Sequence, residues 1–262
     1  MRHSFPFIAL LMVLSMLSGG GRMAAGGMCG VAAGTCSTAA DDSSASRTEV
    51  LFETTEGNIR IVLFNETPIH RDNFVKHIDG HFYDSVLFHR VIRNFMIQAG
   101  DPDSRTAPPG VEIGEGDCGY TLPAEILYPT LFHKRGAVAM AREDDEVNPE
   151  RRSNCSHFYI VWGKRFSTAD IEYMKNWLDT TSNGAMKMPP EIASVYRRTG
   201  GTPHLDGGYT VFGEVTEGLD VVEKIQRADT DDNDRPVYDV RILRAVVTKR
   251  GASTTGNQIM TP

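Results

Sequence analysis

The sequence predicts a mainly β protein, a closed antiparallel β-barrel capped by two helices and carrying a helical insert. Two observations lead to this fold class. Many short segments alternate between apolar and polar residues with the period of a β-strand, and helical segments lie at separate places among them. This order is typical of a closed sheet whose ends are covered by helices. With 262 residues, 40% of them hydrophobic, the chain can build one domain with a substantial core.

The first predicted elements are a hairpin and a helix. Residues 50–54 and 58–64 alternate as strands, and residues 56–57 form the turn between them. Thr67 suits a helix N-cap and Pro68 suits the first helical position. One face of this helix is expected to pack on the core. Its apolar residues at roughly helical spacing are Ile69, Phe74, Val75 and Ile78.

Three further helices are predicted. Ser167 or Thr168 can cap the first, and the two prolines at 189–190 can begin the second, which ends before the glycines at 200–201. The third is marked by apolar residues at Leu219, Val222 and Ile225. The remaining predicted strands are 88–98, 136–140, 156–161, 209–215 and 237–247.

The charge of the chain argues against a nucleic-acid binder. Lys and Arg total 27 against 34 Asp and Glu, which gives a formal net charge of -7. A nucleic-acid-binding protein usually carries a basic stripe, and none is visible here. We therefore expect no nucleic-acid partner and a solvated acidic surface.

Residues 1–20 have the build of a secretory signal peptide. A short polar start precedes an apolar core at 5–17, and small residues at 18–21 offer a cleavage site. The alternative is a membrane anchor, but the apolar run is short for a hydrocarbon layer of about 30 Å. We expect export to the periplasm or cell envelope. Lipid anchoring is not favoured, because neither Cys29 nor Cys36 follows a small residue.

The rest of the chain divides by composition. Residues 21–47 are rich in Gly, Ala and Ser and predict a flexible tether, since they bury too little surface to offset the entropy of ordering. Residues 48–250 form the predicted folded domain, and residues 251–262 a disordered tail.

The most informative motif is residues 88–101, which read FHRVIRNFMIQAGD. It places an arginine and a glutamine among apolar residues, without paired carboxylates, an activated nucleophile or metal-ligand spacing. Such a site suits a reaction that needs neither proton abstraction nor a covalent intermediate. Rotation about a prolyl peptide bond is a reaction of this kind.

This motif resembles the active-site segment of the cyclophilins, a family of peptidyl-prolyl cis/trans isomerases. Only Asn94 departs from the family's common form, which has glycine there. Three later segments also resemble the family's motifs: GAVAMA at 136–141, NCSHFYI at 154–160 and HLDGGYTVFGEV at 204–215. The resemblance covers the chain from about residue 48 to about residue 249, and four motifs in order make it highly specific.

The resemblance implies an eight-stranded barrel with a helix over each end. It also identifies residues 166–201 as an insert, because the family usually has a short connection there. The insert precedes His204 and Leu205 directly, so we expect it beside the substrate groove. Whether it is a passive extension or influences substrate choice stays open at this stage.

The chemistry of the reaction explains the arginine. Amide resonance sets a barrier of about 18–20 kcal/mol to rotation about an X-Pro bond. A twisted amide loses conjugation, and its nitrogen becomes a better hydrogen-bond acceptor. A donor that reaches this nitrogen binds the transition state more tightly than either isomer. Arg90 offers a charged, rigid fork of donors, and the resemblance assigns it this role.

The resemblance assigns the other site residues as well. Phe95 joins Arg90 as catalytic, with Gln98 holding the substrate backbone and steadying the arginine. The substrate-binding residues it implies are Met96, Ala141, Arg142, His157, Tyr159, His204, Leu205 and Tyr209. Ala141 and Arg142 match a strand that pairs with the bound peptide.

Five of these positions differ from the family's common residues. Arg142 replaces asparagine, His157 replaces glutamine, Tyr159 replaces phenylalanine, His204 replaces tryptophan and Tyr209 replaces histidine. The hydroxyl of Tyr159 needs a partner. The change at His204 puts tight cyclosporin binding in doubt, without removing the arginine or the proline pocket.

Residues 114–119 read GEGDCG and match a dinucleotide-binding pattern by count only. Two acids stand where a phosphate would bind and no helix pattern follows, so we predict a glycine-rich loop. No close histidine spacing indicates a metal, and we expect neither metal nor cofactor. In the fold that the resemblance implies, this loop lies beside residue 155. Cys118 and Cys155 are therefore a candidate disulfide of an exported protein.

The sequence thus predicts a monomeric prolyl isomerase that acts on X-Pro peptides and on unfolded exported proteins. The alternative is a non-catalytic module or chaperone that binds proline peptides in the same groove. Arg90, Phe95 and Gln98 favour the enzyme, while His157, His204 and the insert keep the alternative open.

Overall fold

The computed structural model describes residues 46–251, whose first elements are the hairpin of β1 (Thr48–Thr54) and β2 (Gly57–Leu63). Alternate side chains of both strands are buried, as the period-2 pattern predicts. The inward side chains include Phe52 and Ile61, which are fully buried.

Helix α1 (Pro68–Asp79) begins at the predicted proline, but its cap differs from the prediction. Thr67 makes no capping hydrogen bond, and its hydroxyl is buried without a hydrogen-bond partner among the described residues. Instead, the carboxylate of Glu125 accepts hydrogen bonds from the N–H groups of Ile69 (3.1 Å) and His70 (2.9 Å). A carboxylate there also complements the positive end of the helix dipole.

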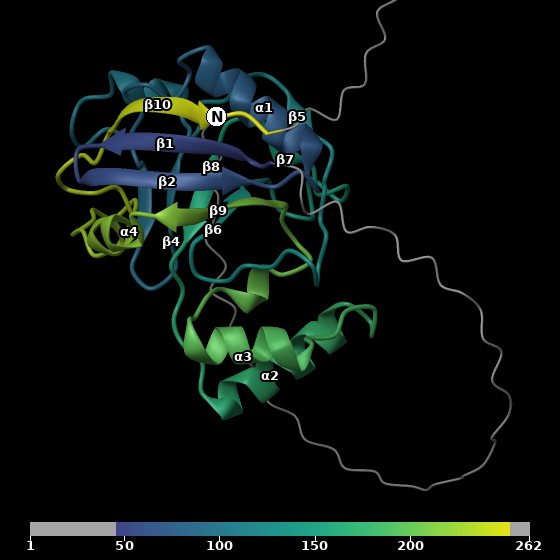
Figure 1. The fold of residues 1–262 in the computed structure, drawn as a ribbon. Coiled ribbons are helices and arrows are strands. Elements are labelled where there is room, and N and C mark those ends of the chain that lie inside the picture. The colour runs from purple at the N-terminus through teal and green to yellow at the C-terminus, as the bar shows by residue number, and fades with distance from the viewer. Residues whose placement is uncertain (1–45, 252–262) are drawn as a thin grey trace, which may run out of the picture. The chain divides into compact units, whose positions relative to one another are not determined.

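Eight strands form one antiparallel sheet in the order β10-β1-β2-β9-β6-β8-β4-β3 (Figure 1). The remaining strands of this sheet are β3 (Arg90–Ile92), β4 (Met96–Ala99), β6 (Ala137–Met140), β8 (Phe158–Val161), β9 (Val211–Glu217) and β10 (Ile242–Lys249). A separate pair, β5 (Thr121–Leu122) with β7 (Ser153–Asn154), was not expected from the sequence.

The predicted closure of the barrel is not confirmed. Within the described residues, no ladder joins the two edge strands β10 and β3. The segment before β3 does meet the start of β10, where the N–H groups of Ser85 and Phe88 donate to the carbonyls of Ile242 (2.8 Å) and Val240 (2.9 Å). Further along, strand β3 lies opposite the segment that precedes β10, where the N–H of Val91 donates to the carbonyl of Asp234 at 2.8 Å.

The single strand predicted at 88–98 is two short strands joined by a turn. Asn94 in this turn has φ 60°, in the left-handed region that asparagine tolerates better than most residues. This conformation accounts for glycine in the family pattern at that position. The turn is fixed by the N–H of Asn94, which donates to Gln226 Oε1 at 2.8 Å.

The predicted helices of the insert are present as α2 (Thr168–Thr181) and α3 (Pro190–Arg198). Of the two candidate caps for α2, the structure uses Ser167, which forms a capping box with Asp170. Figure 1 shows the two helices packed beside each other. They share a small apolar core of their own, made of Ile171, Leu178, Met188, Ile192, Ala193 and Tyr196.

The last predicted strand begins later than expected. Residues 237–241 precede β10, and the side chains of Val237 and Tyr238 are exposed by 56% and 87%. Helix α4 (Leu219–Gln226) contacts β2, β3 and β4, whereas α1 contacts β9 and β10. Two short 3-10 helices complete the described part, at Pro102–Arg105 and Pro203–Leu205.

Some of the predictions concern residues that the structure does not describe. The signal peptide at 1–20 lies outside the described residues, as do all but residues 46–47 of the tether and all but Gly251 of the tail. None of the helices within 46–251 combines the length and the apolar character needed to cross a membrane.

Candidate active site

One pocket of about 170 Å³ gathers most of the predicted site residues. Its lining is Arg90, Phe95, Met96, Gln98, Ala141, Arg142, Tyr159, Leu205 and Tyr209. They come from β3, β4 and β8, from the turn between β3 and β4, and from the segments that follow β6 and precede β9. Residues more than a hundred positions apart therefore form one concave surface.

The strand register sets the central row of the site. Arg90 on β3 lies opposite Gln98 on β4, and Gln98 lies opposite Tyr159 on β8. Residues paired in this way project from the same face of a sheet. The arginine, the glutamine and the aromatic ring are thus neighbours because of backbone pairing.

Asp234, a residue that the motifs do not mark, contacts the arginine. Arg90 Nε lies 3.3 Å from Asp234 Oδ2, and both side chains are about one-third exposed. The pair is tied together through the backbone as well, because the N–H of Val91 donates to the carbonyl of Asp234 at 2.8 Å. The only signal in the sequence was the density of aspartates at 229–234, which is also typical of a solvated loop.

Phe95 is held from two sides. Its carbonyl accepts hydrogen bonds from the N–H groups of Trp162 and Gly163, both at 2.9 Å. Its ring stacks on that of His204, with centroids 5.4 Å apart. His204, a predicted substrate-binding residue, is not among the residues that line this pocket, and it contacts the site through this stacking on Phe95.

Tyr159 presents its ring to the pocket and directs its hydroxyl away from it. The side chain is 4% exposed, and the hydroxyl lies 3.1 Å from His133 Nε2. Burial raises the pKa of Tyr159 well above its ordinary value, so the hydroxyl keeps its proton. The partner that this hydroxyl requires is therefore a buried histidine.

Ala141 and Arg142 differ in how their backbones are used. The N–H of Ala141 donates to the His157 carbonyl at 2.9 Å, and its own carbonyl accepts from the N–H of Asn154 at 2.8 Å. The backbone of Arg142 has no such partner within the described residues. The Arg142 side chain covers the Tyr209 ring at 4.6 Å and donates to the Gly208 carbonyl at 2.7 Å.

His157 lies in an adjacent hollow of about 430 Å³, and the lining of the first pocket does not include it. Its Nε2–H donates to the Gly116 carbonyl at 2.6 Å. Burial lowers the pKa of His157, which favours the neutral ring, and the proton of that ring lies on the Nε2 that donates to Gly116. His157 therefore holds the glycine-rich loop in place. The two hollows share Gln98, Ala141 and Arg142.

The two predicted cysteines meet at this loop. Cys118 and Cys155 are joined by a disulfide, with Cα atoms 6.0 Å apart. Residues 114–119 form a loop in the structure, without a following helix, as the sequence predicts. No group of three His, Cys, Asp or Glu residues within 46–251 is arranged to hold a metal ion.

Comparisons with known proteins agree on one family. A family model described as "Cyclophilin type peptidyl-prolyl cis-trans isomerase/CLD" matches residues 49–247. A curated relative from Staphylococcus epidermidis is 35% identical over 195 residues, covering 74% of this chain and 88% of the relative. One from Staphylococcus aureus is 35% identical over 197 residues with the same coverage. Both carry the name "Putative peptidyl-prolyl cis-trans isomerase".

Solved structures show the same fold. The chain is similar to a cyclophilin-type peptidyl-prolyl cis-trans isomerase of Cryptosporidium parvum, with a TM-score of 0.54 and 22% identity. The match covers 78% of this chain and 99% of that one. A second crystal structure of that protein, determined in the presence of the dipeptide Ala-Pro, matches with a TM-score of 0.53 over 77% of this chain.

Proposed function

The chain belongs to the cyclophilin-type peptidyl-prolyl cis-trans isomerases, and from this premise we propose that Arg90 catalyses X-Pro rotation in exported, partly unfolded chains. The observation that carries the proposal is the single pocket in which Arg90 and Gln98 stand beside Phe95, Met96 and Leu205. A proline ring needs an apolar recess, and its twisted amide needs a donor at the rim.

The mechanism follows from where charge develops. In the planar amide the nitrogen lone pair is delocalised, and in the twisted amide it becomes localised on nitrogen. A guanidinium at the pocket rim stabilises this localised pair and has less to offer either planar isomer. The interaction therefore lowers the barrier selectively. No proton has to move and no covalent bond has to form, which fits a site without a nucleophile or general base.

Binding of the peptide backbone is assigned to Arg142. Its N–H and carbonyl make no hydrogen bond to the backbone of the described residues, and Arg142 is one of the residues that line the pocket. An extended peptide can pair with such groups as an added strand. The related Cryptosporidium parvum protein was crystallised in the presence of Ala-Pro, which supports a proline-containing peptide as substrate.

Exported proteins are the proposed substrates because of two features. Residues 1–20 have the pattern of a secretory signal peptide. Cys118 and Cys155 lie close enough to pair, and disulfides persist mainly in oxidising compartments. Cell fractionation tests this part: the protein should be found in the periplasm or cell envelope, shortened at its amino terminus. A full-length cytoplasmic protein would contradict it.

Replacing the catalytic arginine tests the mechanism. Arg90→Ala should lower kcat/KM for a short X-Pro peptide by a factor on the order of 10²–10³, the usual effect of losing a transition-state donor. The matched control is Arg93→Ala on the adjoining turn, because Arg93 is exposed and its side chain, within residues 46–251, bonds only to the Arg227 carbonyl. Activity is measured by a protease-coupled assay, and folding by near-ultraviolet circular dichroism. Full activity in a folded Arg90→Ala variant would overturn the mechanism.

A further inference from the structure

The second helix of the insert carries a tyrosine whose hydroxyl group is buried. Tyr196 on α3 is fully buried, and its O–H donates to Asp206 Oδ2 at 2.6 Å. Its ring packs edge to face against Phe132 and Phe166, at 5.6 Å and 6.1 Å between centroids. The position of this hydroxyl is therefore set by the packing of α3 on the rest of the domain.

Asp206 collects hydrogen bonds from two directions. Besides the Tyr196 hydroxyl on Oδ2, its Oδ1 accepts from the backbone N–H of His133 at 2.9 Å and lies 3.0 Å from His133 Nδ1. Asp206 is only 4% exposed, and a carboxylate buried this deeply is costly unless such donors surround it. Losing one donor should therefore disturb the others.

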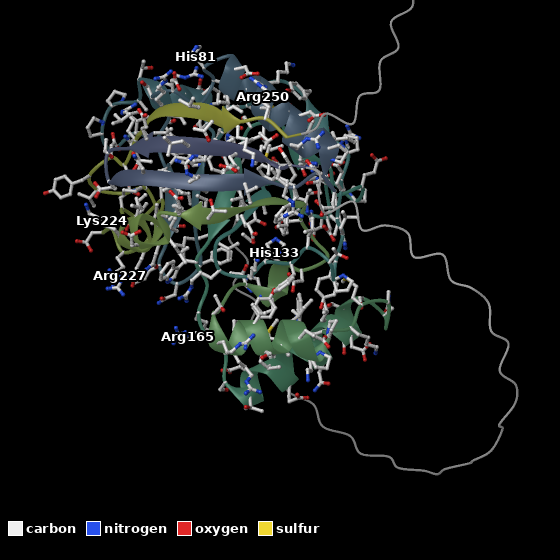
Figure 2. All side chains as sticks on the ribbon, in the orientation of Figure 1. His81, His133, Arg165, Lys224, Arg227 and Arg250 are labelled. Carbon is white, nitrogen blue, oxygen red and sulfur yellow. A yellow bond between two sulfur atoms is a disulfide. The ribbon has the colours of Figure 1, made fainter. Side chains whose placement is uncertain are left out.

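His133 connects Asp206 to Tyr159, a residue of the proline pocket. Because Nδ1 faces a carboxylate, Nδ1 carries the proton and Nε2 is left as an acceptor. The Tyr159 hydroxyl donates to this Nε2 at 3.1 Å, and the two rings are nearly parallel. Figure 2 marks His133 in the region between the strands and α3, as these contacts require.

The donors and acceptors in this series of hydrogen bonds are consistent from Tyr196 to Tyr159. Burial raises the pKa of Tyr159 and of Tyr196 well above the ordinary value, so both hydroxyls keep their protons and act as donors. The hydrogen bonds thus converge on Asp206 from Tyr196 on one side and from His133 and Tyr159 on the other. All four side chains are at most 4% exposed, so water does not replace a missing partner readily.

We infer that the insert positions Tyr159, which forms a wall of the proline pocket, through this series of hydrogen bonds. Tyr196, Asp206 and His133 are then positioning residues for Tyr159. The inference rests on the proposed function, because that function places the proline ring against Tyr159. The Tyr159 hydroxyl is held by His133, and the pocket receives an apolar ring surface. A shift of α3 changes this restraint without touching Arg90.

A second contact between the insert and the domain supplies a control. Tyr128 also uses its hydroxyl to join the two, donating to the Lys187 carbonyl at 3.0 Å. This contact is exposed, and its hydrogen bond does not lead to a residue of the pocket. Tyr128→Phe therefore also removes a tyrosine hydroxyl that joins the insert to the rest of the domain. It leaves the hydrogen bonds between Tyr196 and Tyr159 intact.

The test is a double-mutant cycle on the kinetics of a short X-Pro peptide. Tyr196→Phe should raise KM about fivefold and change kcat by less than about twofold, since one buried hydrogen bond is lost away from the reacting atoms. Tyr128→Phe should match the unmodified enzyme. The Tyr159→Phe variant lacks the hydroxyl that bonds to His133, so the hydrogen bonds no longer connect to the pocket. In this background Tyr196→Phe should have no further effect on KM.

Two kinetic results would overturn the inference: an unchanged KM in folded Tyr196→Phe, or the same increase with and without the Tyr159 hydroxyl. The second would assign the effect to general packing. Failure of the proposed function looks different, because the unmodified enzyme would then be inactive or insensitive to Arg90→Ala. If Tyr196→Phe does not fold, nitrogen NMR of the His133 ring decides. A proton on Nδ1 supports the chain, and a neutral ring with its proton on Nε2 overturns it.

Discussion

Arg90, the proposed catalytic donor, lies beside a residue that no motif identifies. Asp234 approaches its Nε at 3.3 Å from a loop that lies 144 positions away in the chain. The arginine side chain has several rotatable bonds, so a fixed carboxylate on one edge of the rigid guanidinium narrows the orientations that its other edge can take. We interpret Asp234 as a positioning residue for the catalytic donor.

Removing this carboxylate should reduce turnover modestly. A partly exposed ion pair is worth about 1 kcal/mol at most, so Asp234→Asn should lower kcat by no more than about fivefold. KM should stay unchanged, because Asp234 does not line the pocket. Asp232→Asn is the matched control, since it removes the same charge from the exposed part of the same loop. Equal kinetics for the two variants would remove Asp234 from the mechanism.

At the scale of elements, the glycine-rich loop depends on a covalent and a polar attachment to the sheet. The disulfide joins Cys118 in the loop to Cys155, between β7 and β8. His157, two residues further on, holds the Gly116 carbonyl. Because the hollow beside the proline pocket is lined by this loop, its shape depends on both attachments.

Breaking the disulfide should lower the free energy of unfolding. The bridge spans a sequence separation of 37 residues, for which the chain-entropy model gives about 4 kcal/mol as an upper figure. Cys118→Ser, or a reductant added to the unmodified protein, should shift urea unfolding by similar amounts. Intact-mass analysis after alkylation without reductant checks the premise. Free thiols at both cysteines in protein purified from the cell envelope would contradict it.

At the scale of the whole molecule, buried histidines tie stability to pH. Burial lowers the pKa of His89 to about 3, and the neighbouring His157 and Arg90 lower it in the same direction. Its Nδ1 has no hydrogen-bond partner among the described residues. Burial also lowers the pKa of His157 and of His77. Below about pH 6.5 the unfolded chain binds protons at these histidines, whereas the folded protein binds them only at lower pH.

The free energy of unfolding should therefore fall as the pH drops from about 6.5 towards 3. For His89 alone, linkage gives a loss of about 2 kcal/mol between pH 7 and pH 5. His89→Phe should remove this part of the pH dependence of the free energy of unfolding, whatever the substitution does to stability at neutral pH. Urea unfolding of both proteins across this range measures it. Parallel pH profiles would show that His89 takes up its proton equally in the folded and unfolded states.

The sequence by itself determined the family, the order of most elements and nine residues of the pocket, because these depend on local motifs and periodic patterns. Tertiary structure alone decided the rest. Glu125 caps α1 from 56 positions beyond Ile69, Asp234 reaches Arg90, and Tyr196 meets Tyr159 through two buried residues. The strand expected at 88–98 divides at Asn94, which bonds to α4. Each of these outcomes depends on which distant groups the fold brings within hydrogen-bond distance, and a local pattern of residues does not specify that.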